Sequence, residues 1–229
     1  MWRWFERSRM MSAETRDIIG LLAGIAPGSS LDAIRERRSQ ARENAQKSYL
    51  ALFEPTDFET FGATERHAAA AFVAGVHGGP EVANFYLAGL AKSVDGPALV
   101  EALKAEIERG KTSGPYGAFP PGPLSVEDKI GLIYRVAEDR KATLGARLAA
   151  ALEHAHLLVF RPRDATAADL QVLLDAGWLA DHRHRHLVAA RCVSGVSGPR
   201  GRRLACARCL ACARQIPRLR PAKERTDHG

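Results

Sequence analysis

The feature that most constrains this chain is an abrupt change of composition near residue 180. Residues 180–229 contain 12 Lys and Arg against 3 Asp and Glu, whereas residues 1–179 contain 21 basic and 23 acidic residues. Every cysteine also lies in the basic part, namely Cys192, Cys206, Cys209 and Cys212. A slightly acidic, cysteine-free body and a basic, cysteine-rich tail are therefore interpreted separately.

Proline and glycine divide the body into segments of helical length, and no segment alternates as a half-buried strand does. The expected helices cover residues 17–22, 31–52, 65–76, 80–92, 98–109, 148–160 and 169–176. An apolar fraction of 46% is ordinary for a globular protein, and no apolar run is long enough to span a membrane. The body is therefore predicted to be an all-α helical bundle.

Residues that favour helix ends mark several of these boundaries. Thr64 is the expected N-cap of the helix over 65–76, which Gly78-Gly79 ends. Thr166-x-x-Asp169 has the form of a capping box before the last predicted helix. Ser125-x-x-Asp128 resembles another, after which helix is expected to resume, most strongly over residues 148–160.

Residues 111–125, KTSGPYGAFPPGPLS, cannot form a regular helix because they hold four prolines and three glycines. Tyr116 and Phe119 within them favour an ordered loop over a flexible linker, laid on the core and close to a site. At the other end of the body, residues 1–13 are expected to be an N-terminal extension, with Met10 or Met11 as alternative starts.

Two segments resemble the halves of a carboxymuconolactone decarboxylase (CMD), or alkylhydroperoxidase D-like, domain. LAAALEHAHLLVFRPRDATAADLQVLLDAGW (148–178) has a P-x-x-x-T-x-x-D link from Pro162 to Asp169 and a helix ending in Leu174, Ala176 and Gly177. ERHAAAAFVAGVHGGPEVANFYLAGLA (65–91) is similar to the first half. With IAPGSSLDAIRERRSQARENAQKSY and TSGPYGAFPPGPLSVEDK, the resemblance is to an uncharacterised CMD-domain subfamily and covers residues 17–178.

The resemblance implies an alkylhydroperoxidase D-like helical domain over residues 14–179 that forms a homo-oligomer. Many members carry a Cys-x-x-Cys pair with a nearby His and an upstream Glu, in which one thiolate attacks peroxide and the second thiol resolves the sulfenic acid. In this chain Gly79 and Val82 stand at the cysteine positions, and Phe85 stands near that of the His. Dithiol peroxidase chemistry is therefore not expected from the body.

Other members of the superfamily act on lactones with acid–base residues and no redox cysteine. By the resemblance, Glu65, His77 and Glu81 are the candidate catalytic residues, because His77 precedes the Gly78-Gly79 point where the family active site opens. In the plainer alternative, His77 caps its helix and Glu65 is a first-turn carboxylate at the helix dipole. His67 is a further candidate. Glu153, His154 and His156 are candidates too, but they fall on one strongly apolar segment and are more consistent with core or interface packing than with metal binding.

The tail contains DHRHRH (181–186) and a C-x-x-C-x-x-C run from Cys206 to Cys212, and these side chains could bind zinc or an iron–sulfur cluster. Its excess of arginine could bind nucleic acid. Neither metal motif is complete. We interpret the tail instead as the product of a reading-frame shift near residues 178–182. The shifted frame permits DIVTLSQLVAFLAFQVRVVAGLRV, which is similar to the terminal helix of CMD domains. As written, residues 180–229 are expected to be disordered, with Cys206, Cys209 and Cys212 as metal ligands only if this frame is genuine.

These observations predict a cytoplasmic, bacterial-type CMD-domain protein without the redox cysteine pair. It would be an acid–base enzyme acting on a small molecule, or an accessory protein of oxidative metabolism, with no cofactor and no membrane association. The alternative is a non-catalytic oligomeric partner subunit of a cysteine-bearing relative. Zinc or nucleic-acid binding through the tail is a third alternative. The expected partners are a second copy of the chain or a related CMD-domain protein.

Overall fold

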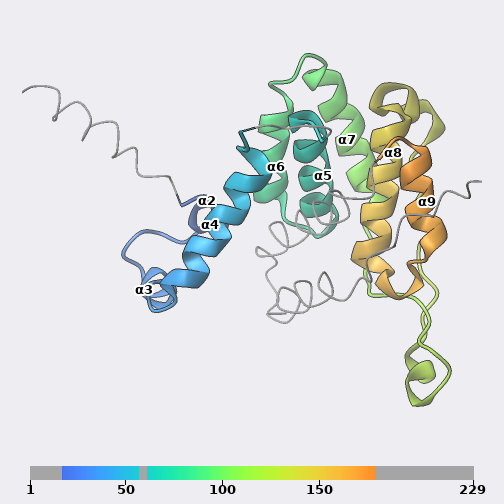
Figure 1. Cartoon of the computed structure of the whole chain (residues 1–229), viewed down its shortest axis with the longest axis horizontal. Helices are drawn as coiled ribbons and strands as arrows, with labels where there is room; N and C mark the ends of the chain where they lie inside the picture. Colours follow the sequence, from blue (N-terminus) through green and yellow to red (C-terminus); the bar gives the residue numbers. More distant parts are fainter. Residues whose placement is uncertain (1–16, 57–60, 179–229) are drawn as a thin grey trace, which may run out of the picture. The chain divides into compact units, whose positions relative to one another are not determined.

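The computed structural model describes residues 17–56 and 61–178 (Figure 1). Their helices are α2 (Ile18–Leu22), α3 (Ser30–Glu36), α4 (Ser39–Phe53), α5 (Ala63–Val76), α6 (Pro80–Leu90), α7 (Gly96–Gly110), α8 (Glu138–Phe160) and α9 (Ala167–Asp175), with 3-10 helices η1 (Pro123–Glu127) and η2 (Pro162–Asp164). Across these ranges, β-structure is limited to an isolated bridge between Gly117 and Lys129. The all-α prediction is confirmed there, whereas the expectations for residues 1–13 and 180–229 lie outside the described residues.

Helix α5 is the centre of the core, because it packs against α4, α6, α7 and α8. From Ala68 to Val76 its sequence is apolar on every side, and Ala68, Ala70, Ala71 and Phe72 have no exposed surface. At Gly75 the Ile107 side chain of α7 lies where a β-carbon would stand, 2.6 Å from that position. Small side chains on α5 thus let its neighbours approach closely. No helix within the described ranges combines the length and apolar character needed to cross a bilayer.

The predicted glycine stops of two helices are confirmed by their hydrogen bonds. After α5, Gly78 has φ +77° and the Gly79 amide donates to the Ala74 carbonyl at 3.0 Å. After α9, Gly177 has φ +85° and the Trp178 amide donates to the Leu173 carbonyl at 3.0 Å. Both ends are Schellman motifs, in which glycine occupies the left-handed position without steric cost.

The predicted capping residues have three different outcomes. The Thr166–Asp169 capping box is confirmed, since the Asp169 amide donates to Thr166 Oγ1 at 3.4 Å and the Thr166 amide donates to Asp169 Oδ2 at 2.8 Å. Thr64 is not the N-cap of α5, because the helix begins at Ala63, two residues earlier than predicted, with Gly62 as its N-cap. Ser125 caps no α-helix, and it lies within η1.

The irregular segment predicted over residues 111–125 extends to residue 137, because α8 begins only at Glu138. Asp128 does not start a helix. Its Oδ1 accepts a hydrogen bond from the Phe119 amide at 2.6 Å instead. Beyond it, Tyr134 and Val136 are buried in the core, so their contacts with the bundle hold this stretch in a non-helical path. Helix α8 itself is interrupted at Gly145, which has φ +79° and ψ 150°.

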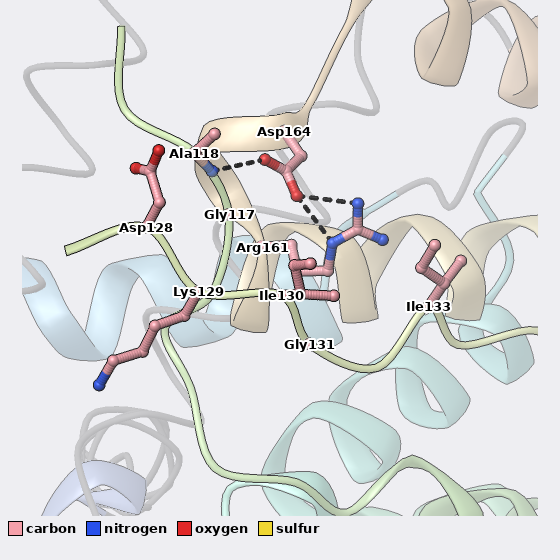
Figure 2. A pocket seen from close by; sticks show the side chains of 9 residues that line it. All are labelled: Gly117, Ala118, Asp128, Lys129, Ile130, Gly131, Ile133, Arg161 and Asp164. Atoms are coloured by element: carbon pink, nitrogen blue, oxygen red, sulfur yellow. Dashed lines mark hydrogen bonds and ion pairs between the residues drawn. The ribbon is translucent and has the colours of Figure 1, made fainter. Parts of the chain in front are cut away.

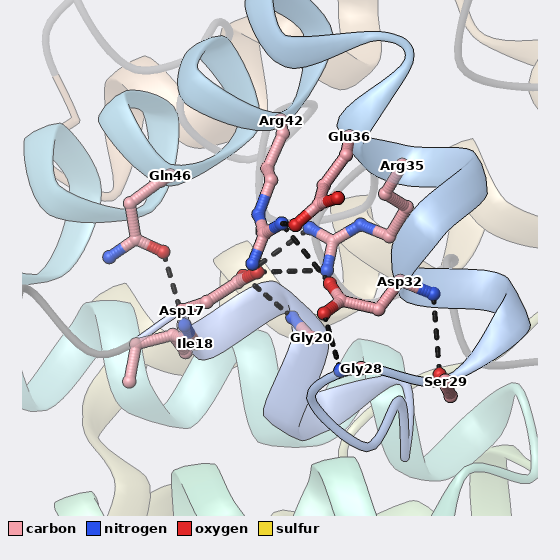
Figure 3. A network of polar contacts seen from close by, with 10 residues as sticks. All are labelled: Asp17, Ile18, Gly20, Gly28, Ser29, Asp32, Arg35, Glu36, Arg42 and Gln46. Atoms are coloured by element: carbon pink, nitrogen blue, oxygen red, sulfur yellow. Dashed lines mark hydrogen bonds and ion pairs between the residues drawn. The ribbon is translucent and has the colours of Figure 1, made fainter.

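The prediction of one helix over residues 31–52 is wrong, because the chain breaks into α3 and α4 at Arg38, with φ −123° and ψ 52°. The break lets Arg35 of α3 and Arg42 of α4 both donate to Asp17, with nitrogen–oxygen distances of 2.9 and 3.0 Å (Figure 3). Arg42 also pairs with Asp32 at 3.1 Å. Partial burial works to raise the pKa of Asp17, but hydrogen bonds from Arg35 and the Gly20 amide outweigh it and lower this pKa.

Replacing Tyr86 of α6 with phenylalanine is expected to raise the free energy of unfolding by up to about 1 kcal/mol. The Tyr86 hydroxyl is buried without a hydrogen-bond partner among the described residues, and its ring packs between those of Phe53 and Phe85. The substitution removes the desolvated hydroxyl and keeps these ring contacts. Urea unfolding of the two proteins measures the change, and a loss above about 1 kcal/mol would show that the hydroxyl has a partner in solution.

Candidate functional site

The three predicted catalytic residues occupy two separate places on the fold. Glu65 lies in the first turn of α5 and His77 is its C-cap, so twelve residues of helix place them about 18 Å apart along the axis. Glu81 is exposed in the first turn of α6, four residues after His77. The structure therefore groups His77 with Glu81 at the α5–α6 junction and leaves Glu65 at the far end of α5.

Glu65 is held in contacts that stabilise the start of α5. One carboxylate oxygen accepts a hydrogen bond from the Gly62 amide at 3.1 Å, and the other lies 2.7 Å from Arg147 Nε. A first-turn carboxylate of this kind satisfies an otherwise unpaired helix amide and interacts favourably with the helix dipole. These contacts agree with the plainer interpretation of Glu65, and its catalytic role stays a prediction.

His77 and Glu81 border the Gly78–Gly79 turn that closes α5. His77 is exposed, and its ring centroid lies 6.1 Å from that of Phe160 in α8. Both side chains are accessible to a solute, but no described cavity includes them. Their position permits proton exchange with solvent, and a catalytic role for them also stays a prediction.

The further histidine and glutamate candidates are packed within the fold. His67 Nδ1 donates to the Ala63 carbonyl at 2.8 Å, and the Val136 amide donates to Glu153 Oε1 at 3.0 Å. His154 and His156 are both buried in α8. His156 Nε2 donates to the Gly110 carbonyl at 2.9 Å. In the part of the chain that the structure describes, no group of three His, Cys, Asp or Glu side chains could hold a metal ion. Cys206, Cys209 and Cys212 lie outside that part.

Glu106 of α7 is a buried carboxylate that was not predicted from the sequence, and it forms a polar cluster within the core. Glu106 has no exposed surface. The Tyr134 hydroxyl donates to its Oε2 at 2.6 Å, and Arg109 Nη1 lies 2.9 and 2.8 Å from its two oxygens. The Tyr134 ring stacks on His156 with centroids 4.7 Å apart. The cluster joins α7, the irregular segment and α8, and its enclosure indicates a structural role.

The signal that could have identified Glu106 is its place on an apolar helix face. It falls between Leu103 and Ile107, three and one residues away, on the buried side of α7. A carboxylate at such a position needs charged or hydrogen-bonding partners in the fold. Burial raises the pKa of Tyr134 far above its ordinary value, and the adjacent Glu106 carboxylate raises it further. Tyr134 therefore remains a hydrogen-bond donor at physiological pH.

A cavity of about 380 Å³ lies where the irregular segment meets η2 (Figure 2). It is lined by Gly117, Ala118, Asp128, Lys129, Ile130, Gly131, Ile133, Arg161 and Asp164. Arg161 Nη2 and Asp164 Oδ2 are 2.8 Å apart, and the Ala118 amide donates to Asp164 Oδ1 at 3.1 Å. These two charges neutralise each other, so the cavity offers a small solute an apolar wall beside an internally paired acid and base.

The described residues thus define a helical-bundle protein with an exposed histidine and carboxylate at the α5–α6 junction and a separate cavity beside η2. Comparison of the chain with protein-family models, with curated proteins and with solved structures gives no match.

Acidification is expected to destabilise the protein through His156. Burial lowers the pKa of His156 from its ordinary value of 6.5, and Arg161 acts in the same direction. As the pH falls below this value, the unfolded chain binds a proton that the folded chain resists, so the free energy of unfolding decreases. Urea unfolding at successive pH values between about 7.5 and 5 measures the slope. His156→Gln, which cannot titrate, should show a shallower slope, and an unchanged slope would contradict this assignment.

Proposed function

We propose that the chain is a CMD-like, alkylhydroperoxidase D-like protein that lacks thiol redox chemistry and acts as an accessory protein of oxidative metabolism in the cytoplasm. The observation that supports this proposal is the α5–α6 hairpin. Its junction has the Gly78–Gly79 turn followed by α6, with Gly79 as the N-cap and Val82 fully buried in the first turn. These are the two positions at which the resemblance places the cysteine pair.

The geometry of the candidate residues favours the accessory role over acid–base catalysis. Glu65 is engaged with Arg147 and Gly62 at the start of α5, and Glu153 accepts a hydrogen bond from Val136. A general acid and base acting on one substrate must both reach it, and Glu65 and His77 are about 18 Å apart. A second candidate function, acid–base catalysis by His77 and Glu81, is favoured by their shared exposure at the α5–α6 junction.

Neither the natural chain nor a variant with Cys192, Cys206, Cys209 and Cys212 all replaced by serine is expected to consume peroxide at the expense of a dithiol reductant. The body has no thiol, and the Cys-x-x-Cys spacings of the tail, between Cys206 and Cys212, lie outside the residues that carry the resemblance. Peroxide consumption with and without reductant, measured for both proteins, tests this expectation. Turnover by the natural chain that is lost in the serine variant would assign the chemistry to the tail and overturn the proposal.

A further inference from the structure

The segment that leads from η1 back to the bundle carries a concentration of exposed apolar side chains. Val126 exposes 90% of its surface, Ile130 102% and Ile133 63%. Leu124 and Leu132 are exposed as well. Monomeric proteins rarely leave such a cluster uncovered. We call residues 117–135 the arm, which departs from the bundle and returns to it across the Gly117–Lys129 bridge (Figure 1).

The apolar pattern of the arm continues outward from the core. Tyr134 and Val136 are buried where the chain enters the bundle. In an extended chain, alternate residues share a face, so Leu132 and Ile130 continue the same apolar row beyond the bundle surface. Residues 130–137 contain no helix, turn or bend, which is consistent with an extended path.

One backbone edge of this path is open. Gly117 and Lys129 exchange two backbone hydrogen bonds, at 2.8 and 3.3 Å, as an antiparallel pair does. Successive residues of a strand direct their backbone groups to opposite edges, so Ile130 and Leu132 direct theirs away from the Gly117 side. Among the described residues, no hydrogen bond reaches the backbone amides of residues 130–133. An unpaired edge with apolar side chains is a template for another strand.

We propose that residues 130–133 pair antiparallel with the same segment of a second copy of this chain, about a two-fold axis at Gly131. In this register Ile130 lies opposite Leu132 of the other copy, and the reciprocal pair forms as well. The outward N–H and C=O groups of Ile130 and Leu132 in one copy then face those of the other copy, and the two copies form four hydrogen bonds. The proposal rests on the arm alone and is independent of the proposed function.

The charge pattern at the two ends of the segment favours a second copy as the occupant. Glu127 and Asp128 lie at one end of the segment and Arg135 at the other, so an antiparallel pair brings unlike charges together at each end. Ile130, Leu132 and Ile133 of the paired segment present roughly 370 Å² per copy, about half of the roughly 800 Å² that each partner buries in a standard interface. Residues 179–229 and an unrelated protein are the competing occupants.

Sedimentation velocity of the full chain over a wide concentration range tests the proposal. The natural protein should be a dimer, and Ile130→Asp with Leu132→Asp should raise its dissociation constant by at least about 100-fold. Val94→Asp is the matched control, because Val94 is fully exposed in the α6–α7 turn and should leave the dimer unchanged. A natural protein that is monomeric throughout, or a dimer that resists the double substitution, would overturn the proposal.

A cross-link gives an independent reading that does not depend on disruptive substitutions. In the proposed register, Lys129 lies opposite Ile133 of the other copy as a non-hydrogen-bonded pair, with α-carbons about 4.5 Å apart. With the four natural cysteines replaced by serine, Lys129→Cys with Ile133→Cys should give a covalent dimer on mild oxidation. Within one chain these positions are about 13 Å apart, too far for a disulfide. Absence of the covalent dimer from a protein that is otherwise folded would contradict the register.

Discussion

Replacing Glu106 with alanine is expected to lower the free energy of unfolding by about 2–4 kcal/mol. The carboxylate is fully buried. It accepts a hydrogen bond from the Tyr134 hydroxyl and forms an ion pair with Arg109. Its removal leaves the Tyr134 hydroxyl without its acceptor in the core and opens a cavity between α7 and the irregular segment. Urea unfolding followed by circular dichroism measures the change.

Glu101 on the same helix provides the matched control for Glu106. It forms an ion pair of the same spacing, with Lys104 at 2.9 Å, but its side chain is 74% exposed. Glu101→Ala should therefore change the free energy of unfolding by less than about 0.5 kcal/mol. Similar losses for Glu101→Ala and Glu106→Ala would contradict the structural role assigned to the buried cluster.

The sequence predicted the helices whose boundaries depend on local chemistry. Gly78 and Gly177 end helices because each stands at a left-handed position, and the Thr166–Asp169 box starts α9. Pro80 begins α6 at the expected residue. These signals act within a few residues of the chain, which is why they can be recognised without knowledge of the tertiary structure.

The structure differs from the sequence-based predictions where contacts between residues distant in sequence determine the backbone path. The α3–α4 break brings Arg35 and Arg42 to the Asp17 carboxylate, 18 and 25 residues away in sequence. Helix α8 begins later than the residue after Asp128 at which helix was expected to resume. The intervening chain instead buries Tyr134 against Glu106, which is 28 residues away. Periodicity within a segment carries no information about such partners, so it predicted one helix too few and an irregular segment too short.

The candidate site was predictable as a set of residue types but not as a constellation. Glu65 and His77 both lie on α5 as expected, yet the length of the helix separates them. The cavity beside η2 joins Gly117 and Lys129 to Arg161 and Asp164, which are more than 30 residues away in sequence. Only the packing of the irregular segment against η2 brings these residues together.

Installing a cysteine pair at the α5–α6 junction is the second substitution expected to have a large effect. Gly79→Cys with Val82→Cys would place thiols at the N-cap and in the first turn of α6, where the helix dipole lowers a thiol pKa. Gly79 has φ −102° and ψ 77°, so the backbone accepts a side chain there, and Val82 is close to cysteine in size. The background should carry serine at the four natural cysteine positions.

Peroxide consumption by this double variant, coupled to oxidation of a dithiol, is the measurement that tests most directly whether the hairpin is a CMD-like site without its thiols. We expect a reversible disulfide between positions 79 and 82 and dithiol-dependent turnover that the cysteine-free parent lacks. Gly79→Ser with Val82→Ser controls for the change in shape. If the two introduced thiols form no disulfide and leave peroxide unreacted, in a protein that keeps its helical circular dichroism spectrum, the hairpin is not a CMD-like site.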